Sequence, residues 1–352
     1  MSAQAISRPT NVSVRTCEGG LPAAWDDYVY KHPRGSLFHL AAWQRVVERI
    51  FGFQSRYLVA NEAGCIRGVL PLFLVRNILQ RSLISTPFAV YGGICADDEE
   101  AENALRQAAC EMAKEERVQY LELREPWPID RAGFHTKQLY VTFDQELPQD
   151  AEQLLRGFPR DTRYMIRKAQ KNGLHAVIDN QQLDIFYQIY AQSVHNLGTP
   201  VFSKTFFRTL QDEFGKQCEI TIVSHRAQAV AGVLSFRFGD WILPYYGGSV
   251  QEGRPLAANN FMYWEVMKQA IANGVRYFDF GRSKLGSGSY AFKTQWNMRK
   301  RPLPYQFFLV GRESMPNYSP ANSRFKLATS VWKHVPFSMS KILGPALVRL
   351  FP

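Results

Sequence analysis

One sequence pattern occurs twice in this chain of 352 residues, in the same order and with similar spacing. From Phe-Gly to Gly-Val-Leu the gaps are 17 and 18 residues, and from Tyr-Gly-Gly to the final segment they are 27 and 29. Only the middle gap differs much, 23 against 14, as expected where a hairpin loop has changed length. A period above about 100 residues indicates duplicated domains and not a solenoid. The two copies are Phe51-Gly52, Gly68-Val69-Leu70, Tyr91-Gly92-Gly93 and Val118–Arg124, and Phe214-Gly215, Gly232-Val233-Leu234, Tyr246-Gly247-Gly248 and Val275–Arg282.

The composition is that of a globular α/β protein, with 46% hydrophobic and 21% charged residues. There is no apolar run of about 18 residues, so no transmembrane helix is expected. Met1–Arg15 also lacks the apolar stretch of a signal peptide. Five scattered cysteines and seven unclustered histidines predict reduced thiols and no metal site. We therefore expect a cytoplasmic protein, with the inner face of a membrane as an alternative location.

The formal net charge of +11 favours a polyanionic partner, such as nucleic acid, a nucleotide-linked substrate or an anionic membrane surface. Plain solubility is the alternative explanation. We predict a disordered N-terminus (residues 1–15) and a first domain (16–150). A basic helical linking element (151–215) belongs to the second domain, whose core follows (216–312), and a basic amphipathic tail (313–352) ends the sequence. The tail either lies on a membrane surface or packs across the domain.

A row of cations follows the first copy of the repeat. Asp161 or Thr162 can begin a helix that ends at Asn172-Gly173. Arg163, Arg167 and Lys171 then share one face of this helix at i, i+4 and i+8, with Arg160 one turn earlier. Guanidinium groups match phosphate oxygens bidentately, so the row predicts phosphate contact, and an ordinary solvated face is the alternative.

The second copy ends in a glycine-rich, basic segment, Arg282–Trp296. It contains the cations Arg282, Lys284 and Lys293 but no GxxxxGK[ST] phosphate-binding motif. Aromatic residues surround Lys293, which predicts a positioned and partly desolvated ammonium group that can stabilise an oxyanion. A solvated loop is the alternative. The aromatic residues are Tyr290, Phe292 and Trp296.

Asp279 lies in the aromatic strand that precedes this segment and shares a face with Tyr277. We expect it to pair structurally with Arg282 or Lys293, and proton acceptance is a second interpretation. The chain has neither GxSxG nor GxGxxG, which argues against a serine nucleophile and a nicotinamide dehydrogenase.

Three segments together resemble the FemAB-like branch of the GNAT superfamily, in particular the FemAB-related proteins associated with PEP-CTERM/exosortase systems. They are Pro159–Gly173, Asn196–Ser203 and Phe278–Trp296, and the resemblance extends over about residues 30 to 310. It implies two tandem GNAT-like domains with mixed sheets flanked by helices and a cleft between them. This agrees with the duplication.

The resemblance also implies transfer of an aminoacyl group from aminoacyl-tRNA to an amine of a nucleotide- or lipid-linked envelope precursor, of peptidoglycan or exopolysaccharide type. No metal or organic cofactor is implied. An acyl-CoA donor is the first alternative, although Gln251–Ala258 fits a pyrophosphate loop poorly, and a non-catalytic scaffold of a polysaccharide or exosortase system is the second. The resemblance places Phe292-Lys293 where the donor ester reacts and makes Arg163 and Arg167 candidates to hold the acceptor's phosphates. The full set of predicted catalytic residues is Lys293 and Asp279, and that of predicted substrate-binding residues is Arg163, Tyr164, Arg167, Thr199, Tyr246, Arg282 and Phe292. We expect Lys293→Met to abolish transfer and to leave the melting temperature nearly unchanged.

Overall fold

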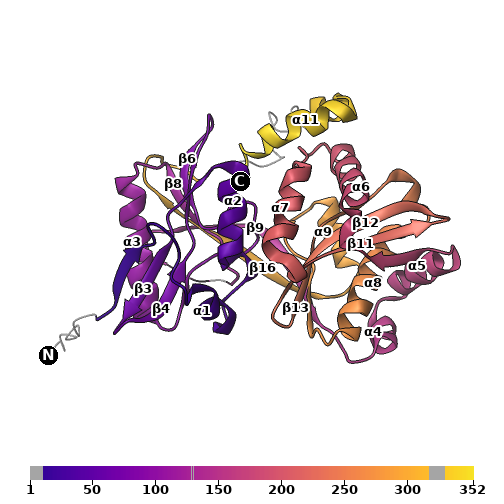
Figure 1. The fold of residues 1–352 in the computed structure, drawn as a ribbon, viewed down its shortest axis with the longest axis horizontal. Helices are drawn as coiled ribbons and strands as arrows, with labels where there is room; N and C mark the ends of the chain where they lie inside the picture. Colours follow the sequence, from indigo (N-terminus) through magenta and orange to yellow (C-terminus); the bar gives the residue numbers. More distant parts are fainter. Residues whose placement is uncertain (1–10, 128, 130, 317–329) are drawn as a thin grey trace.

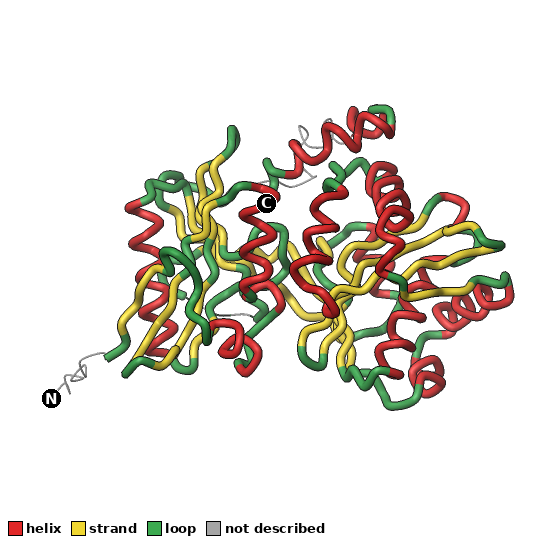
Figure 2. The backbone as a smooth tube through the Cα atoms, viewed as in Figure 1, coloured by secondary structure: helices red, strands yellow, loops and turns green. Residues whose placement is uncertain are grey.

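The computed structural model describes residues 11–127, 129, 131–316 and 330–352. Two α/β halves lie side by side in Figure 1, the N-terminal half on the left and the C-terminal half on the right. The described strands form a four-stranded sheet in the order β1-β3-β4-β7 and a twelve-stranded mixed sheet. The order in the large sheet is β10-β11-β12-β13-β14-β9-β16-β8-β6-β5-β2, with β15 paired to β9. Helices cover both sheets (Figure 2). The predicted α/β class is confirmed.

The first half contains β1 (Ser13–Thr16), α1 (Trp25–Lys31), η1 (Leu37–His39), α2 (Ala41–Phe51), β2 (Gln54–Ser55), β3 (Leu58–Glu62), β4 (Cys65–Leu70), β5 (Phe73–Arg76), β6 (Arg81–Ile84), β7 (Cys95–Ala96), α3 (Glu99–Glu115), β8 (Tyr120–Leu123) and β9 (His135–Glu146). The second half contains α4 (Ala151–Gly157), α5 (Arg160–Lys171), β10 (His175–Ile178), η2 (Asn180–Gln182), α6 (Leu183–Asn196), α7 (Lys204–Phe214), η3 (Gly215–Gln217), β11 (Cys218–His225), β12 (Gln228–Phe238), β13 (Trp241–Ser249), η4 (Gln251–Gly253), α8 (Ala258–Ala272), β14 (Tyr277–Asp279), β15 (Ser283–Lys284), α9 (Gly288–Thr294), β16 (Arg299–Leu309) and α11 (Phe337–Val348).

Three of the four repeated motifs occupy equivalent elements, which supports the duplication. The antiparallel hairpin β3–β4 corresponds to β11–β12, and helix α3 corresponds to α8. Each copy then has one parallel pair, β6–β8 in the first and β13–β14 in the second. The copies differ at the repeated Tyr-Gly-Gly motif. Tyr246 lies within β13, whereas Tyr91 lies in a loop, where its carbonyl accepts a hydrogen bond from Thr86 Oγ1.

Two long strands outside the repeat, β9 and β16, join the halves. Strand β9 pairs with β14 of the second half, and β16 pairs with both β9 and β8. Asp144 on β9 is buried and accepts hydrogen bonds from Arg299 (2.6 Å) and Arg301 on β16. The large sheet is therefore continuous across the molecule, and both halves contribute strands to it.

The N-terminal segment corrects one prediction. Residues 13–16 form β1 and pair antiparallel with β3, so disorder over residues 1–15 is wrong for residues 13–15. Val12 and Val14 pack against the core of the first half, and this apolar alternation stabilises the edge strand. Residues 1–10 lie outside the described residues.

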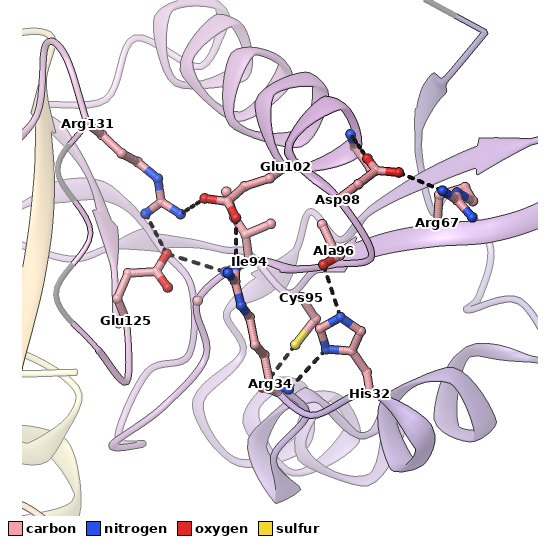
Figure 3. Close-up of polar contacts among 12 residues, drawn as sticks. His32, Arg34, Arg67, Ile94, Cys95, Ala96, Asp98, Glu102, Glu125 and Arg131 are labelled. Atoms are coloured by element: carbon pink, nitrogen blue, oxygen red, sulfur yellow. Dashed lines mark hydrogen bonds and ion pairs between the residues drawn. The ribbon is translucent and has the colours of Figure 1, made fainter.

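A buried ionic network fixes the first half (Figure 3). Arg131 donates to Glu125 (2.7 Å) and to Glu102 (2.6 Å), and Arg34 donates to the same Glu102 (2.6 Å). Burial raises the pKa of Glu125, while Arg131 opposes this shift. The network ties the loop after β8 to α3 and to the segment after α1.

The tail packs on the protein over its described residues; in Figure 1 α11 lies above α6 and α7 of the second half, and the C-terminus lies beside α2 of the first half. Trp332 Nε1 donates to the carbonyl of Thr199 (3.2 Å), and Arg124 Nη2 donates to the carbonyl of Pro352 (2.9 Å). These contacts support the packed alternative for the tail; residues 317–329 lie outside the described residues. Of the helices that the structure describes, none is long and apolar enough to cross a membrane.

Candidate functional site

A cavity lined by several of the predicted residues begins where two parallel strands separate. Strands β13 and β14 pair only at Trp241–Tyr277 and Ile242–Phe278. Beyond these pairs the strands diverge, and residues 244–247 and 280–282 line a cavity of about 450 Å³. The first half contributes Phe88 and Val90 to its wall, and the α6–α7 loop, α8, α9 and the tail contribute the rest. The cavity therefore lies between the halves, as predicted.

Helix α9 brings Lys293 to this cavity. The helix begins after Ser287, whose hydroxyl accepts from the Tyr290 N–H. The Lys293 side chain reaches the loop after β14, where Nζ donates to the carbonyls of Phe280 (2.5 Å), Gly281 (2.9 Å) and Arg282 (3.4 Å). Lys293 is only 8% exposed. Three carbonyl acceptors suit a protonated ammonium group, which has three donors and no acceptor.

The surroundings of Lys293 bring the pKa of its ammonium group closer to neutral pH. Burial lowers the pKa of Lys293 to about 8, and the positive charge of Arg282 also lowers it, while Asp279 raises it. The ammonium is thus charged at pH 7, at the wall of a cavity where charge interactions are stronger than in water. Its contact with the Arg282 carbonyl, at 3.4 Å, is longer than an ordinary N–H···O hydrogen bond. That proton is the one most easily redirected to the oxygen of a bound ligand.

Tyr246 also lines the cavity, but its hydroxyl is not exposed to it. Its side chain is buried, and its hydroxyl has no hydrogen-bond partner among the described residues. Burial raises the pKa of Tyr246 well above its ordinary value, so the hydroxyl keeps its proton. The neighbouring Tyr245 hydroxyl, in contrast, donates to the carbonyl of Phe88 (3.0 Å). A buried unpaired hydroxyl costs free energy. The Tyr246 ring packs among Tyr190 and Phe207, so this cost is borne inside the core of the second half.

Arg282 adds a cation to the same wall. Its guanidinium carbon lies 4.6 Å from the Tyr140 ring centre and 5.8 Å from that of Tyr305. Nη1 also donates to the Tyr305 hydroxyl (3.3 Å). Within the described part of the chain, no carboxylate forms a salt bridge with Arg282, and no Asp or Glu lines the cavity. The cavity is therefore positively charged and suits an anionic ligand or an oxygen that becomes negative.

Asp279 supports the site from behind the cavity. It is 2% exposed and accepts hydrogen bonds from Thr142 Oγ1 (2.6 Å), the Gly281 N–H (2.7 Å) and the Tyr91 hydroxyl. The expected pairing with Arg282 or Lys293 is wrong, because β9 and the loop of the first half supply hydroxyl donors instead. With its acceptors engaged and a position outside the cavity wall, Asp279 is placed to orient the loop that holds Lys293.

The other predicted site residues divide into two groups. Thr199 lines the cavity, whereas Phe292 packs on the rings of Tyr263, Phe280 and Trp296 beside it. The α5 residues lie outside the cavity wall: Tyr164 and Arg167 are exposed, and Arg163 donates to the Arg156 carbonyl (2.9 Å). The structure thus brings together Thr199, Tyr246, Arg282 and Lys293 of the predicted set.

The arginine row is nevertheless linked to the site. Helix α5 begins at Arg160, after Pro159 as its N-cap residue, close to the predicted start. Thr162 Oγ1 donates to the carbonyl of Gln295, which directly follows α9 (2.7 Å). The predicted site residues did not include Tyr91 and Thr142, which bind Asp279. Tyr91 carried a signal, because it belongs to the repeated Tyr-Gly-Gly motif.

Comparisons with known proteins agree with this architecture. Residues 156–294, which include the cavity residues named above from the second half, match the acetyltransferase (GNAT) domain. The fold is similar to the crystal structure of FemX (TM-score 0.65, 18% identity, covering 82% of this chain and 95% of that chain). It is also similar to L-PGS from Bacillus licheniformis, with a TM-score of 0.56 and 11% identity over 89% of this chain and 97% of that chain. A tandem GNAT protein from the clavulanic acid biosynthesis pathway has a TM-score of 0.52 and 12% identity over 86% of this chain and 100% of that chain.

No curated protein matches the sequence. The solved structures define the fold, and the chain has the tandem GNAT architecture that the duplication and the resemblance predicted.

Proposed function

We propose that this protein is an N-acyltransferase that moves an acyl group from an activated donor to an amine of a cell-envelope precursor. The observation that carries the proposal is the buried, charged Lys293 at the wall of a cavity between the halves. The match of residues 156–294 to a GNAT acetyltransferase domain supports acyl transfer as the class of reaction.

The geometry suits attack of an amine on an activated carbonyl. The nitrogen lone pair forms the new C–N bond, and the carbonyl oxygen becomes an oxyanion. The Lys293 ammonium, on the cavity wall, would stabilise this charge. The bond from carbon to the leaving oxygen or sulfur then breaks, and the proton lost by the amine balances the charge on the leaving group. Because the donor is already activated, the protein mainly aligns the reactants.

We favour an aminoacyl ester, such as aminoacyl-tRNA, as the donor. The net charge of +11 and the exposed Arg167 beside Arg163 on α5 suit extended phosphates. We assign these two arginines to phosphate contact with a nucleotide- or lipid-linked acceptor. FemX and a lysylphosphatidylglycerol synthetase share the fold, which is consistent with this proposal.

Acyl-CoA is the alternative donor, because the tandem GNAT protein from the clavulanic acid biosynthesis pathway, a structure solved without AcCoA, has a similar fold. The segment before α8 forms η4 and a turn with Ala257 at φ 60°, where a pyrophosphate loop would lie. A cytoplasmic location and the exosortase-associated branch remain predictions.

A donor panel tests the proposal. The protein is incubated with aminoacyl-tRNAs or acyl-CoAs and with amine-bearing envelope precursors, and amide products are detected by mass spectrometry. Lys293→Met should lower transfer by about a hundredfold or more. The exposed Lys216→Met serves as a matched control.

The contacts of Lys293 revise the expected stability of this variant. Methionine leaves the carbonyls of the β14 loop without their donor, so the melting temperature should fall, in contrast to the prediction from sequence. Assays are therefore run well below the melting temperature. Full activity of Lys293→Met removes the proposed role, and absence of transfer from every donor favours the scaffold alternative.

A further inference from the structure

Helix α11 is apolar on two opposite faces. Ser340, Gly344 and Val348, at i, i+4 and i+8, are buried against the second half. Gly344 approaches so closely that a Cβ there would lie 2.7 Å from the backbone nitrogen of Val201. The outer face carries Ile342, which is 76% exposed. A surface helix of a globular protein normally presents a polar outer face, so this face is expected to have a partner.

Other exposed apolar side chains lie beside α11. The β5–β6 hairpin presents Ile78, 88% exposed, and Leu79, and the loop after α6 presents Leu197, 64% exposed. Contacts join these segments to the tail: Asn77 Nδ2 donates to the carbonyl of Arg349 (3.1 Å). In Figure 1 the hairpin beside β6, the upper end of α6 and α11 lie along the same edge of the molecule. We call this surface the apolar rim; its members are Ile78, Leu79, Leu197, Met339, Ile342 and Leu343.

The charged side chains of the tail beside the apolar rim are all positive over residues 330–352. Residues 330–352 contain Lys333, Lys341 and Arg349 but no Asp or Glu. The whole chain carries a net charge of +11, so two copies would repel each other when they meet rim to rim. Apolar side chains interspersed with lysine and arginine are the combination that binds the interface of an anionic bilayer.

We propose that the apolar rim docks on the surface of an anionic lipid bilayer. The side chains of Ile342, Leu343 and Ile78 enter the headgroup boundary, and the lysines of the tail meet lipid phosphates. The same segments line the Lys293 cavity through Thr199, Val348 and Phe351. It follows, if the proposed function is correct, that the amine acceptor is a lipid-linked precursor held at the membrane surface.

Vesicle flotation of the full-length protein tests the docking. The wild type should bind vesicles that contain phosphatidylglycerol, bind pure phosphatidylcholine vesicles weakly, and lose binding as salt rises. Ile342→Glu and Ile78→Glu should each weaken binding by about tenfold or more, because an apolar side chain leaves the interface and a negative charge enters it. The matched control is Ile178→Glu, an exposed apolar residue on edge strand β10, which should bind like the wild type.

Three results overturn the proposal. One is equal binding of the wild type to both kinds of vesicle, and another is undiminished binding of Ile342→Glu. The third is a concentration-dependent dimer that Ile342→Glu abolishes, which would make the rim an interface between copies. Transfer to a water-soluble amine is measured in parallel. In Ile342→Glu, retained transfer with lost vesicle binding supports docking. In the wild type, vesicle binding without detectable transfer counts against the proposed function alone.

Discussion

At the residue scale, Tyr246 of the cavity wall carries a buried hydroxyl that has no partner among the described residues. Tyr246→Phe removes a buried hydroxyl with no hydrogen bond, so the free energy of unfolding should change little. The hydroxyl lies among the rings of the core and is not exposed to the cavity, so kcat/KM should also change little. Tyr245→Phe is the contrasting variant, because it loses the bond to Phe88 and about 1 kcal/mol of stability. Steady-state kinetics and thermal unfolding of both variants make the comparison; a large fall of kcat/KM in Tyr246→Phe would show that the hydroxyl reaches the substrate.

The charge of Lys293 makes a second prediction at this scale. Only the protonated amine can stabilise an oxyanion, and its pKa is about 8, so kcat/KM should fall as the pH rises through about 8. Asp279 raises this pKa, so Asp279→Asn should move the fall to lower pH. Thr142→Val removes a hydrogen bond to Asp279 but no charge, so its profile should keep the wild-type position. A fall at the same pH in Asp279→Asn and in the wild type would show that another group controls the profile.

At the scale of elements, the features that could be predicted are those determined by residues close together in the chain. The helix that begins near Asp161 and the aromatic surroundings of Lys293 follow from short-range patterns, and the structure contains them. Strands β9 and β16 were missed, because neither belongs to the repeat and their partners lie far away in the chain. The partners of Asp279 were missed for the same reason, since Thr142 lies on β9 and Tyr91 lies in the other half.

Helix α5 shows the same difference between what spacing along the chain predicts and what long-range contacts determine. The spacing of Arg163 and Arg167 predicted a common helix face, and α5 places both on its outer side. Spacing along one helix does not give the direction in which that face points relative to a cavity. That direction is set by the packing of α5 on α8 and by the bond from Thr162 to Gln295, both of which are long-range contacts. The parts of the site on strand β13 and on the loop after β14 were therefore predictable, because each comes from one continuous segment of the sequence.

At the scale of the whole molecule, the continuous sheet makes the two halves one folding unit. Strand β9 pairs only with strands of the second half among the described residues, namely β14, β15 and β16. Residues 16–150 alone would leave β9 without a partner and Asp144 without Arg299 and Arg301. Unpaired strand edges promote association, and a buried carboxylate without its partners is costly. Duplication of the domain has therefore not produced two independent domains.

This argument predicts a single cooperative unfolding transition for the full chain, with equal calorimetric and van't Hoff enthalpies in scanning calorimetry. Residues 16–150 expressed alone should be unfolded or aggregated. Joining residues 297–312 to that segment through a flexible linker supplies β16, which pairs with both β8 and β9, and should restore much of the native secondary structure measured by circular dichroism. Two resolved transitions in the full chain, or a cooperatively folded 16–150 segment, would show that each half is stable without the shared strands.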